Sequence, residues 1–335
     1  MTIQNYRRAL WGLIVLLLGL AGLSLFVGRY PSPIWMPPQT LLHDPLAQRL
    51  VLNLRLPRIL AAMLLGMSLA ASGTVLQMIF RNPLVEPGFL GVSHGAAFGA
   101  ALSIVALGAS GLVTQAAAAL FGCLGLVLSY ALARHIRYGG WTLRLVLAGI
   151  AISALFSAGV GVLKYVADPL TQLPELVFWM LGALWGVTWQ ETLSILPVTT
   201  AALVALLLMR WRLNLLALDD ATAFSLGTAT ARERTVLLVA AVAATAAIVS
   251  VSGVVGWVGL IVPQLARSLL GADGQRALPG AVLIGGAFAL VCDTVARTAL
   301  SSEIPLGILT SLIGALGFST LMVMPQQLAP WGLKD

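Results

Sequence analysis

The chain has 335 residues, of which 59% are hydrophobic and only 9% are charged, and its net charge is +7. An average soluble domain carries roughly a quarter charged residues, so this composition excludes a compact water-soluble fold. In lipid only helices and closed barrels satisfy the backbone, and apolar runs of about twenty residues favour helices. The basic residues stand singly or in pairs between apolar runs, which argues against binding to nucleic acid. The sequence therefore predicts an all-α polytopic protein in contact with membrane lipid.

Proline, glycine and charged residues divide the chain into about ten apolar spans within one transmembrane domain, residues 1–335. The predicted spans are residues 9–28, 58–80, 92–107, 112–134, 145–166, 191–209, 234–252, 257–270, 279–299 and 306–326. Residues 92–107 and 257–270 are short for a crossing of about twenty residues, so they are expected to tilt, start from re-entrant loops or be shielded by neighbours. A half-buried helix too short to span is predicted near residues 173–187. Small residues recur within spans, as in the run Gly66–Gly73, which favours close helix packing.

The placement of Lys and Arg predicts that both termini lie in the cytoplasm. In this orientation 13 of the 19 basic residues fall on the cytoplasmic side and 6 outside. Cytoplasmic loops of membrane proteins carry such an excess. The external basic residues, which the rule leaves unexplained, are Arg29, Arg49, Arg55, Arg58, Lys164 and Arg297.

Catalytic and metal-binding patterns are missing from the sequence. A phosphate-binding P-loop needs a lysine after its glycines, and neither Lys164 nor Lys334 has that context. The histidines and cysteines show no metal-ligand spacing. We therefore expect no enzyme activity, no metal site and no cofactor, so that any ATP and magnesium would be bound by a partner subunit.

Asp293 is the one acidic residue well inside a predicted span, and Arg297 follows four residues later. Residues at this spacing share a helix face and can form an ion pair. Acidic groups inside membranes also bind substrates or protons in secondary transporters. The sequence leaves both readings open, and the second would make the chain an ion-coupled secondary transporter that uses Asp293.

The longest polar stretch, residues 210–234, is predicted to face the cytoplasm. Its apolar residues suggest one face across one or two short helices, with Gly227 ending the second. These apolar residues are Leu215, Leu216, Leu218, Phe224 and Leu226. Such an element either lies on the membrane surface or docks a cytosolic partner, and composition alone does not separate the two.

Several motifs, in collinear order from about residue 50 to the end, together resemble the FecCD-type permease family. In the first half they are Arg55-Leu56-Pro57-Arg58, Gln77, Arg81-Asn82-Pro83-Leu84, Glu86-Pro87-Gly88 and Gly91-Val92-Ser93. In the second half they are Gly256-Trp257-Val258-Gly259-Leu260-Ile261-Val262-Pro263, Leu278-Pro279-Gly280, Asp293 with Ala296-Arg297, and Glu303-Ile304-Pro305-Leu306-Gly307. The resemblance implies a type II ABC importer permease fold in the bacterial inner membrane. It also implies a homodimer with a central pathway, two cytosolic ABC ATPase subunits and a periplasmic substrate-binding protein.

The resemblance implies three kinds of site. Residues 214–228, including Leu215, Leu216, Leu218, Asp219, Phe224, Leu226 and Gly227, look like the coupling helices that contact the ATPase, which favours the docking reading. Arg55, Arg58 and Arg297 match positions that meet acidic residues of the binding protein, with snorkelling or local pairing as the alternative. Asn82, Leu84, Thr142 and Leu143 match a cytoplasmic gate, Thr142 and Leu143 lying between the fourth and fifth spans, with ordinary loop packing as the alternative.

The family carries metal chelates, so an iron-siderophore or haem is expected first, cobalamin next, and then an oxyanion such as molybdate. The pathway is expected along the fifth, eighth and tenth spans and the helix near residues 173–187, which carry no cluster of ligand groups. The chain departs from the family at Gln264, where histidine is usual, and at Gly274-Gln275. These departures put details of the cytoplasmic surface in doubt.

Overall fold

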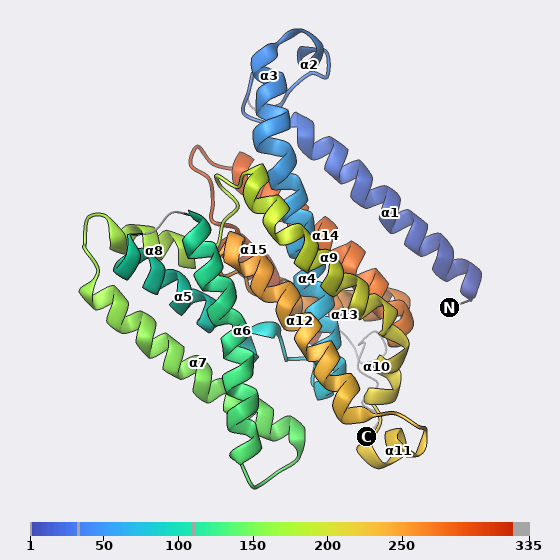
Figure 1. Ribbon diagram of the computed structural model, residues 1–335. Coiled ribbons are helices and arrows are strands. Elements are labelled where there is room, and N and C mark those ends of the chain that lie inside the picture. Colours follow the sequence, from blue (N-terminus) through green and yellow to red (C-terminus); the bar gives the residue numbers. More distant parts are fainter. Residues whose placement is uncertain (1, 32–33, 109–110, 324–335) are drawn as a thin grey trace.

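The computed structural model describes residues 2–31, 34–108 and 111–323, and this part of the chain is a bundle of helices (Figure 1). Seven of its helices are long and apolar enough to cross a membrane. They are α1 (Ile3–Phe26), α4 (Leu56–Phe80), α6 (Gly111–His135), α7 (Trp141–Val166), α9 (Trp189–Leu208), α12 (Thr230–Ser252) and α14 (Gly274–Thr298). Three shorter apolar helices are α5 (Val92–Leu107), α13 (Val258–Leu270) and α15 (Leu306–Val323).

Short elements connect these helices. They are β1 (Val27–Gly28), β2 (Ile34–Trp35), α2 (Thr40–His43), α3 (Pro45–Leu50), the π-helical turn η1 (Val51–Arg55), the 3₁₀ turn η2 (Pro87–Leu90), α8 (Gln172–Met180), α10 (Arg210–Leu216) and α11 (Asp220–Ser225). β1 and β2 form an antiparallel pair. α3 and η1 lead directly into α4, so that helical backbone runs from Pro45 to Phe80.

Each of the predicted spans coincides with one of the apolar helices, and the predicted all-α membrane fold is confirmed. Residues 324–326 of the last predicted span lie outside the described residues. The helix predicted near 173–187 ends earlier, at Met180. The prediction was wrong there because Gly182 and Gly186 take φ values of 69° and 72°, which a right-handed helix does not allow. α14 starts at Gly274 and not near 279, because the carboxylate of Asp273 caps its first turn.

α4 lies at the centre of the bundle, packed against α14, α12, α13 and α9. Glycines let the backbones approach: a Cβ built on Gly66 would lie 1.9 Å from the carbonyl oxygen of Gly285 on α14. One built on Gly73 would lie 1.9 Å from that of Gly259 on α13. In lipid, such small residues favour helix association because they allow close van der Waals contact. The recurring small residues of the sequence therefore mark the central helix crossings.

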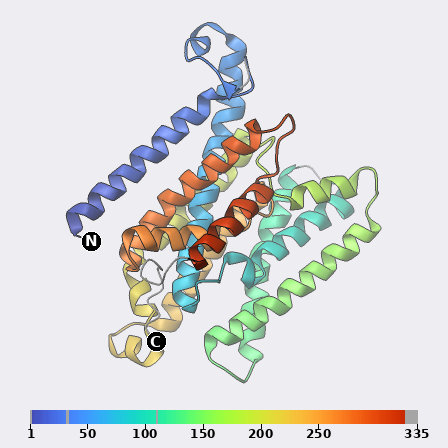
Figure 2. The ribbon, with the colours of Figure 1, turned by 180° about the vertical axis from the view of Figure 1, so that it is seen from behind.

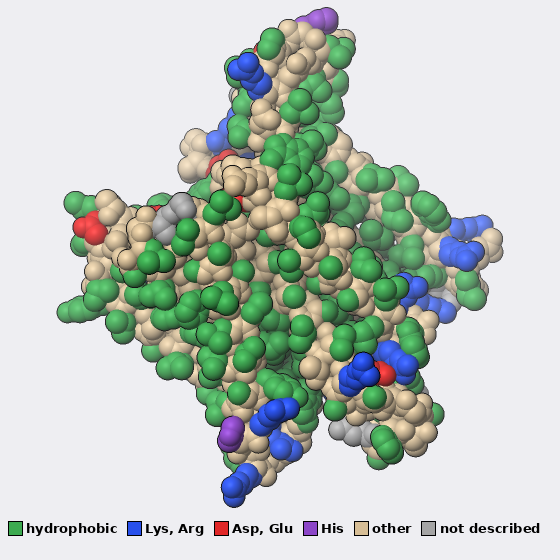
Figure 3. Space-filling view, viewed as in Figure 1, with side chains coloured by type: hydrophobic (Ala, Val, Ile, Leu, Met, Phe, Trp, Pro, Cys, Tyr) green, Lys and Arg blue, Asp and Glu red, His purple; other side chains and the backbone are tan. Residues whose placement is uncertain are grey.

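Helices α5, α6, α7 and α8 form a second group beside this core, and Figures 1 and 2 show it from opposite sides. α1 packs mainly on α14 along the other flank and is largely exposed. Hydrophobic side chains cover the middle of the face shown in Figure 3, while Lys and Arg gather toward its lower end and its right margin. An apolar middle and basic ends are expected of a protein that spans a bilayer.

Candidate functional site

Two short helices, α10 and α11, lie at the lower end of the molecule in Figure 1, before the start of α12. The carboxylate of Asp219 caps α11, accepting hydrogen bonds from the backbone N–H of Thr222 at 2.9 Å and its hydroxyl at 2.6 Å. These hydrogen bonds lower the pKa of the Asp219 carboxyl. Gly227 follows α11 with a φ of 76°. The predicted pair of short helices, closed by Gly227, is present.

The apolar residues of this segment do not share one face. Leu218, Phe224 and Leu226 are 38%, 77% and 57% exposed, and Leu215 is half-buried. Leu216 is fully buried among core residues of α4 and α14, because α10 packs against both helices. The expectation that Leu216 joins an outward apolar face was therefore wrong. We call the three exposed residues in and beside α11, Leu218, Phe224 and Leu226, the α11 knob.

The α11 knob is joined to the helices beside it by hydrogen bonds. The guanidinium of Arg81, at the end of α4, donates to the carbonyl oxygen of Leu218. The side-chain amide of Asn214 on α10 donates to the carboxylate of Asp273 at 2.7 Å and accepts from the backbone N–H of Gly274 at 2.8 Å. Hydrogen bonds thus connect the α10–α11 segment to the end of α4 and the start of α14.

The departures from the family pattern have structural roles here. A Cβ on Gly274 would lie 3.0 Å from the Cβ of Leu213, so the absence of a side chain lets α10 approach α14. The backbone N–H of Gln275 donates to the capping carboxylate of Asp273. Gln264 is buried on α13, and its side-chain amide donates to the carbonyl oxygen of Pro83 at 3.4 Å. Gln264 therefore contacts the loop that contains the predicted gate.

The residues predicted to form a gate lie at two places in the fold. Asn82 accepts a hydrogen bond from the backbone N–H of Leu84 at 2.9 Å, which closes a tight turn after α4, and Leu84 is 44% exposed. Thr142 and Leu143 lie in the first turn of α7 and not in the connection before it. The predicted boundary was wrong because α7 already starts at Trp141, which packs into the bundle.

An aromatic contact brings the two gate segments together. The rings of Phe80, two residues before Asn82, and Trp141, directly before Thr142, are stacked with centroids 5.7 Å apart. Such offset pairs add about 0.5–1.5 kcal/mol beyond the apolar area they bury. The end of α4 and the start of α7 are therefore in direct contact in this structure.

A buried ion-pair network occupies the other end of α4 and α14. The guanidinium of Arg58 contacts the carboxylates of Asp293 at 2.9 Å and Glu303 at 2.8 Å. Arg297 Nε lies 3.6 Å from Asp293 Oδ2, and another of its nitrogens donates to the carbonyl and the hydroxyl of Ser24, both at 2.6 Å. Asp293 is fully buried. Two arginines thus hold Asp293, which agrees with the first of the two predicted roles, an ion pair.

The three arginines predicted to dock a binding protein are mostly buried. Arg55 and Arg297 are 9% and 8% exposed, and the Arg58 side chain is 12% exposed. Arg55 donates to the carbonyl oxygens of Leu25 at 2.6 Å and Tyr30 at 3.3 Å. In this structure all three engage groups of their own chain, as the alternative of local pairing expects. Contact with a partner stays a prediction.

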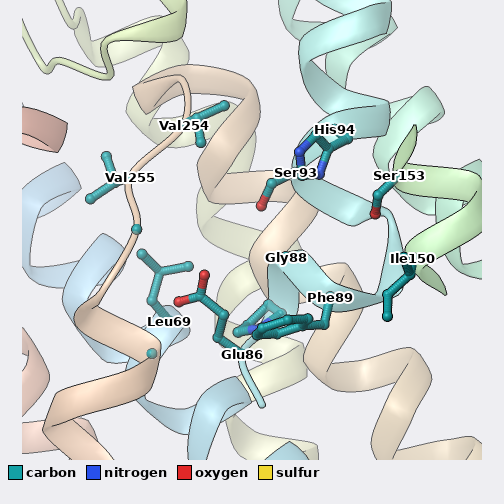
Figure 4. Close-up of a pocket in the computed structure, with 13 residues that line it drawn as sticks. Leu69, Glu86, Gly88, Phe89, Ser93, His94, Ile150, Ser153, Val254 and Val255 are labelled. Atoms are coloured by element: carbon teal, nitrogen blue, oxygen red, sulfur yellow. The ribbon is translucent and has the colours of Figure 1, made fainter. Parts of the chain in front are cut away.

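An inner cavity of about 320 Å³ lies between the core and the second group of helices (Figure 4). Glu86 from the loop after α4, Ser93 and His94 from α5, and Ser153 from α7 contribute its polar groups. Leu69, Phe89, Ile150, Val254 and Val255 supply its apolar wall. The fifth and eighth apolar spans, expected along the pathway, both border this cavity through Ile150, Ser153 and Gly259.

Glu86 is a site residue that the sequence reading did not single out. Its carboxylate accepts a hydrogen bond from the backbone N–H of Trp257, which lies just before α13. The sequence did contain a signal for Glu86. It is the one acidic residue between the second and third predicted spans, and it belongs to the motif Glu86-Pro87-Gly88. Within the described residues, no group of three or more His, Cys, Asp or Glu side chains is placed to hold a metal ion.

Comparisons with known proteins agree with this arrangement. The model of the FecCD transport family matches residues 14–324. The molybdate import system permease protein MolB of Haemophilus influenzae is 40% identical over 327 residues, covering 95% of this chain and 96% of its own. The vitamin B12 import system permease protein BtuC of Klebsiella pneumoniae is 37% identical over 327 residues, covering 96% and 95%. A solved inward-facing structure of a metal-chelate type ABC transporter superposes with a TM-score of 0.87 at 40% identity, covering 94% of this chain and 99% of its own.

The match spans nearly the whole chain and includes the fold. ABC importer permeases of this kind sit in the bacterial inner membrane and work as dimers with ATPase subunits and binding proteins. The ATPase activity lies in the separate subunits, so this chain is not itself an enzyme. Nothing in the comparisons supports the alternative of an ion-coupled secondary transporter. The chain belongs to the FecCD transport family of ABC importer permeases.

Proposed function

We propose that two copies of this chain form a pathway for a metal chelate or metal oxyanion, with two cytosolic ATPases on one side and a periplasmic binding protein on the other. The observation that carries this proposal is the α11 knob, whose three exposed apolar side chains lie in the predicted coupling segment, where a partner can cover them. The knob and the predicted coupling segment 214–228 coincide.

The proposed orientation puts both termini and the α11 knob in the cytoplasm. The support is the distribution of basic residues, 13 on the proposed cytoplasmic side against 6 outside. The loop between α6 and α7, which carries Arg137, and the α10–α11 segment lie at the same end of the bundle in Figure 1. The C-terminal residues 324–335 lie outside the described part of the chain.

We propose that ATPase movements reach the gate through Arg81. Its guanidinium holds the carbonyl oxygen of Leu218 in the coupling segment, and its backbone, with a φ of 49°, ends α4 directly before Asn82. Asn82, Leu84, Thr142 and Leu143 would then narrow the cytoplasmic end of the pathway. A cysteine at position 84 should react with a membrane-impermeant thiol reagent at a rate that changes when ATP is added, and an ATP-independent rate would contradict the gate role.

The cargo follows from the family and is selected outside the membrane by the binding protein. One relative reported above is named for molybdate import and is 40% identical to this chain, and the other is named for vitamin B12 import and is 37% identical. These identities are too close to rank the two cargoes for this chain. Iron-siderophores, haem, cobalamin and molybdate therefore all remain in the proposal. The inner cavity, with one acidic group and no metal-binding cluster among the described residues, suits passage rather than tight binding.

The test of this function is ATP hydrolysis by the reconstituted assembly. The chain would be placed in vesicles with the ATPase and the binding protein encoded beside it. ATP hydrolysis would be measured with an iron-siderophore, haem, cobalamin or molybdate, and without the binding protein as the control. Stimulation by one loaded binding protein confirms the importer and names its cargo. Uptake driven by a proton gradient without the ATPase would contradict the proposal.

Replacing Phe224 with alanine should weaken ATPase binding by about 2 kcal/mol or more, because a large exposed aromatic side chain at the centre of a contact often dominates its affinity. Phe224 is 77% exposed on α11. The matched control is Phe178→Ala, which removes an exposed aromatic side chain from α8 on the opposite side. Affinity of the purified ATPase for the chain in nanodiscs is the measurement. Equal affinities for both variants would exclude Phe224 from the interface.

A further inference from the structure

A second cavity, of about 350 Å³, lies at the outer end of α4 and α14, beside the β1–β2 hairpin. Four arginines line it, namely Arg29, Arg55, Arg58 and Arg297. Glu303 is the acidic residue in its lining, and Asp293 lies behind it in contact with Arg58 and Arg297. Four cations and two carboxylates leave two positive charges in surplus at this site.

The two positive charges in surplus are those of Arg55 and Arg29. Asp293 and Glu303 are engaged by Arg58 and Arg297. Arg55 donates to backbone carbonyl oxygens, and Arg29 donates to the carbonyl oxygen of Ser301. Among the described residues, neither guanidinium has a carboxylate within ion-pair distance. Carbonyl oxygens satisfy N–H groups, but they do not neutralise the charge.

Acidic groups near the cavity do not remove this imbalance. The carboxylate of Asp44 accepts a hydrogen bond from the hydroxyl of Tyr30 at 2.6 Å. It also accepts one from the backbone N–H of Leu46 at 2.8 Å. These two donors lower the pKa of the Asp44 carboxyl, which lies between α2 and α3 and is not among the residues that line the cavity.

Arg55 is buried, and a buried cation without a counter-ion is costly, so the site favours an anion, with the exposed Arg29 adding positive charge at its edge. The planar guanidinium presents paired N–H donors that match the oxygens of a carboxylate or a tetrahedral oxyanion. A volume near 350 Å³ is at the small end of ligand pockets and accommodates a small ion with its waters.

We propose that this outer arginine cavity binds a small free oxyanion, with tetrahedral ions such as sulfate or molybdate as the ligand class. Arg29 and Arg55 supply the charge that holds the anion, and Arg58 and Arg297 complete the wall. The site does not depend on which cargo is transported, and it exists in the chain before any partner binds. A carboxylate of the binding protein is the competing source of the same chemistry.

The test is binding of radiolabelled sulfate to the full chain in nanodiscs of zwitterionic lipid at low ionic strength, with molybdate as competitor. Saturable binding is expected, displaced by molybdate and not by chloride at matched ionic strength. Arg29→Gln removes one charged partner at an exposed position, where folding is not at risk, and should weaken binding about tenfold. Arg55→Gln should weaken it at least as much.

The matched control is Arg49→Gln, which removes the same charge from an exposed position on α3 that does not line the cavity. Its affinity for sulfate should stay within about twofold of the unmodified chain, since distant exposed charges are screened. Equal weakening by Arg49→Gln would mean a general surface field and would overturn the proposal. Absence of saturable binding, together with a loss of binding-protein affinity in Arg29→Gln, would assign the cavity to the partner's carboxylate instead.

Discussion

Replacing Gly66 with leucine is expected to separate α4 from α14 and to abolish the folded state of most molecules. A Cβ at this position would lie 1.9 Å from the carbonyl oxygen of Gly285 and 2.5 Å from its carbon, both backbone atoms. The reverse contact is equally close, since a Cβ on Gly285 would lie 2.3 Å from the oxygen of Gly66. Neither helix can yield without moving as a whole, so the cost should exceed the 1–3 kcal/mol that is roughly typical of overpacking.

The matched control is Gly22→Leu on α1, where a Cβ would meet no atom within 4 Å. Both variants add the same side chain to an apolar helix, so they differ only in the packing at the site. Thermal unfolding in detergent, followed by the monodisperse fraction on size exclusion, measures the effect. If Gly66→Leu melted at the same temperature as Gly22→Leu, the close crossing of α4 and α14 would be contradicted.

Replacing Asp293 with asparagine should lower the free energy of unfolding by about 3–5 kcal/mol, the usual cost of breaking a buried ion pair from one side. The fully buried carboxylate contacts Arg58 at 2.9 Å and Arg297 at 3.6 Å. Arg58 keeps Glu303 after the change, but Arg297 would lose its contact with a carboxylate. Uncompensated charge on Arg297 is therefore the physical reason for the loss.

A double variant separates lost charge balance from lost packing. Asp293→Leu with Arg297→Met removes both charges and keeps apolar volume, so it should be more stable than Asp293→Asn. Glu175→Gln, at an exposed position on α8, is the control for removing an acidic group. Unfolding in denaturant is the measurement. An Asp293→Asn chain that is as stable as Glu175→Gln, yet has lost transport, would return Asp293 to a role in substrate or proton binding.

The apolar spans, the helical fold and the family could be predicted from the sequence. In lipid each helix satisfies its own backbone hydrogen bonds. The position of a helix can therefore be predicted from a short stretch of sequence, namely from an apolar run and from residues such as Pro83 and Gly227 that interrupt it. The same is true of the two short helices α10 and α11, the second of which carries Phe224. Helix ends moved at Met180, Trp141 and Gly274, where a positive φ, the packing of one aromatic ring or a capping carboxylate decides the boundary.

Burial and partners were decided by the tertiary structure alone. The sequence shows Arg58 and Asp293 as separate charges, whereas the fold places them 2.9 Å apart across α4 and α14. It also turned Leu216 inward and placed Glu86 on a cavity. The reason is that the exposure and electrostatic partner of a side chain depend on elements distant in sequence, while the class of the fold depends on each span by itself. For this protein the sequence determined the membrane-spanning fold class and the family. Helix packing decided which charged side chains lie next to one another.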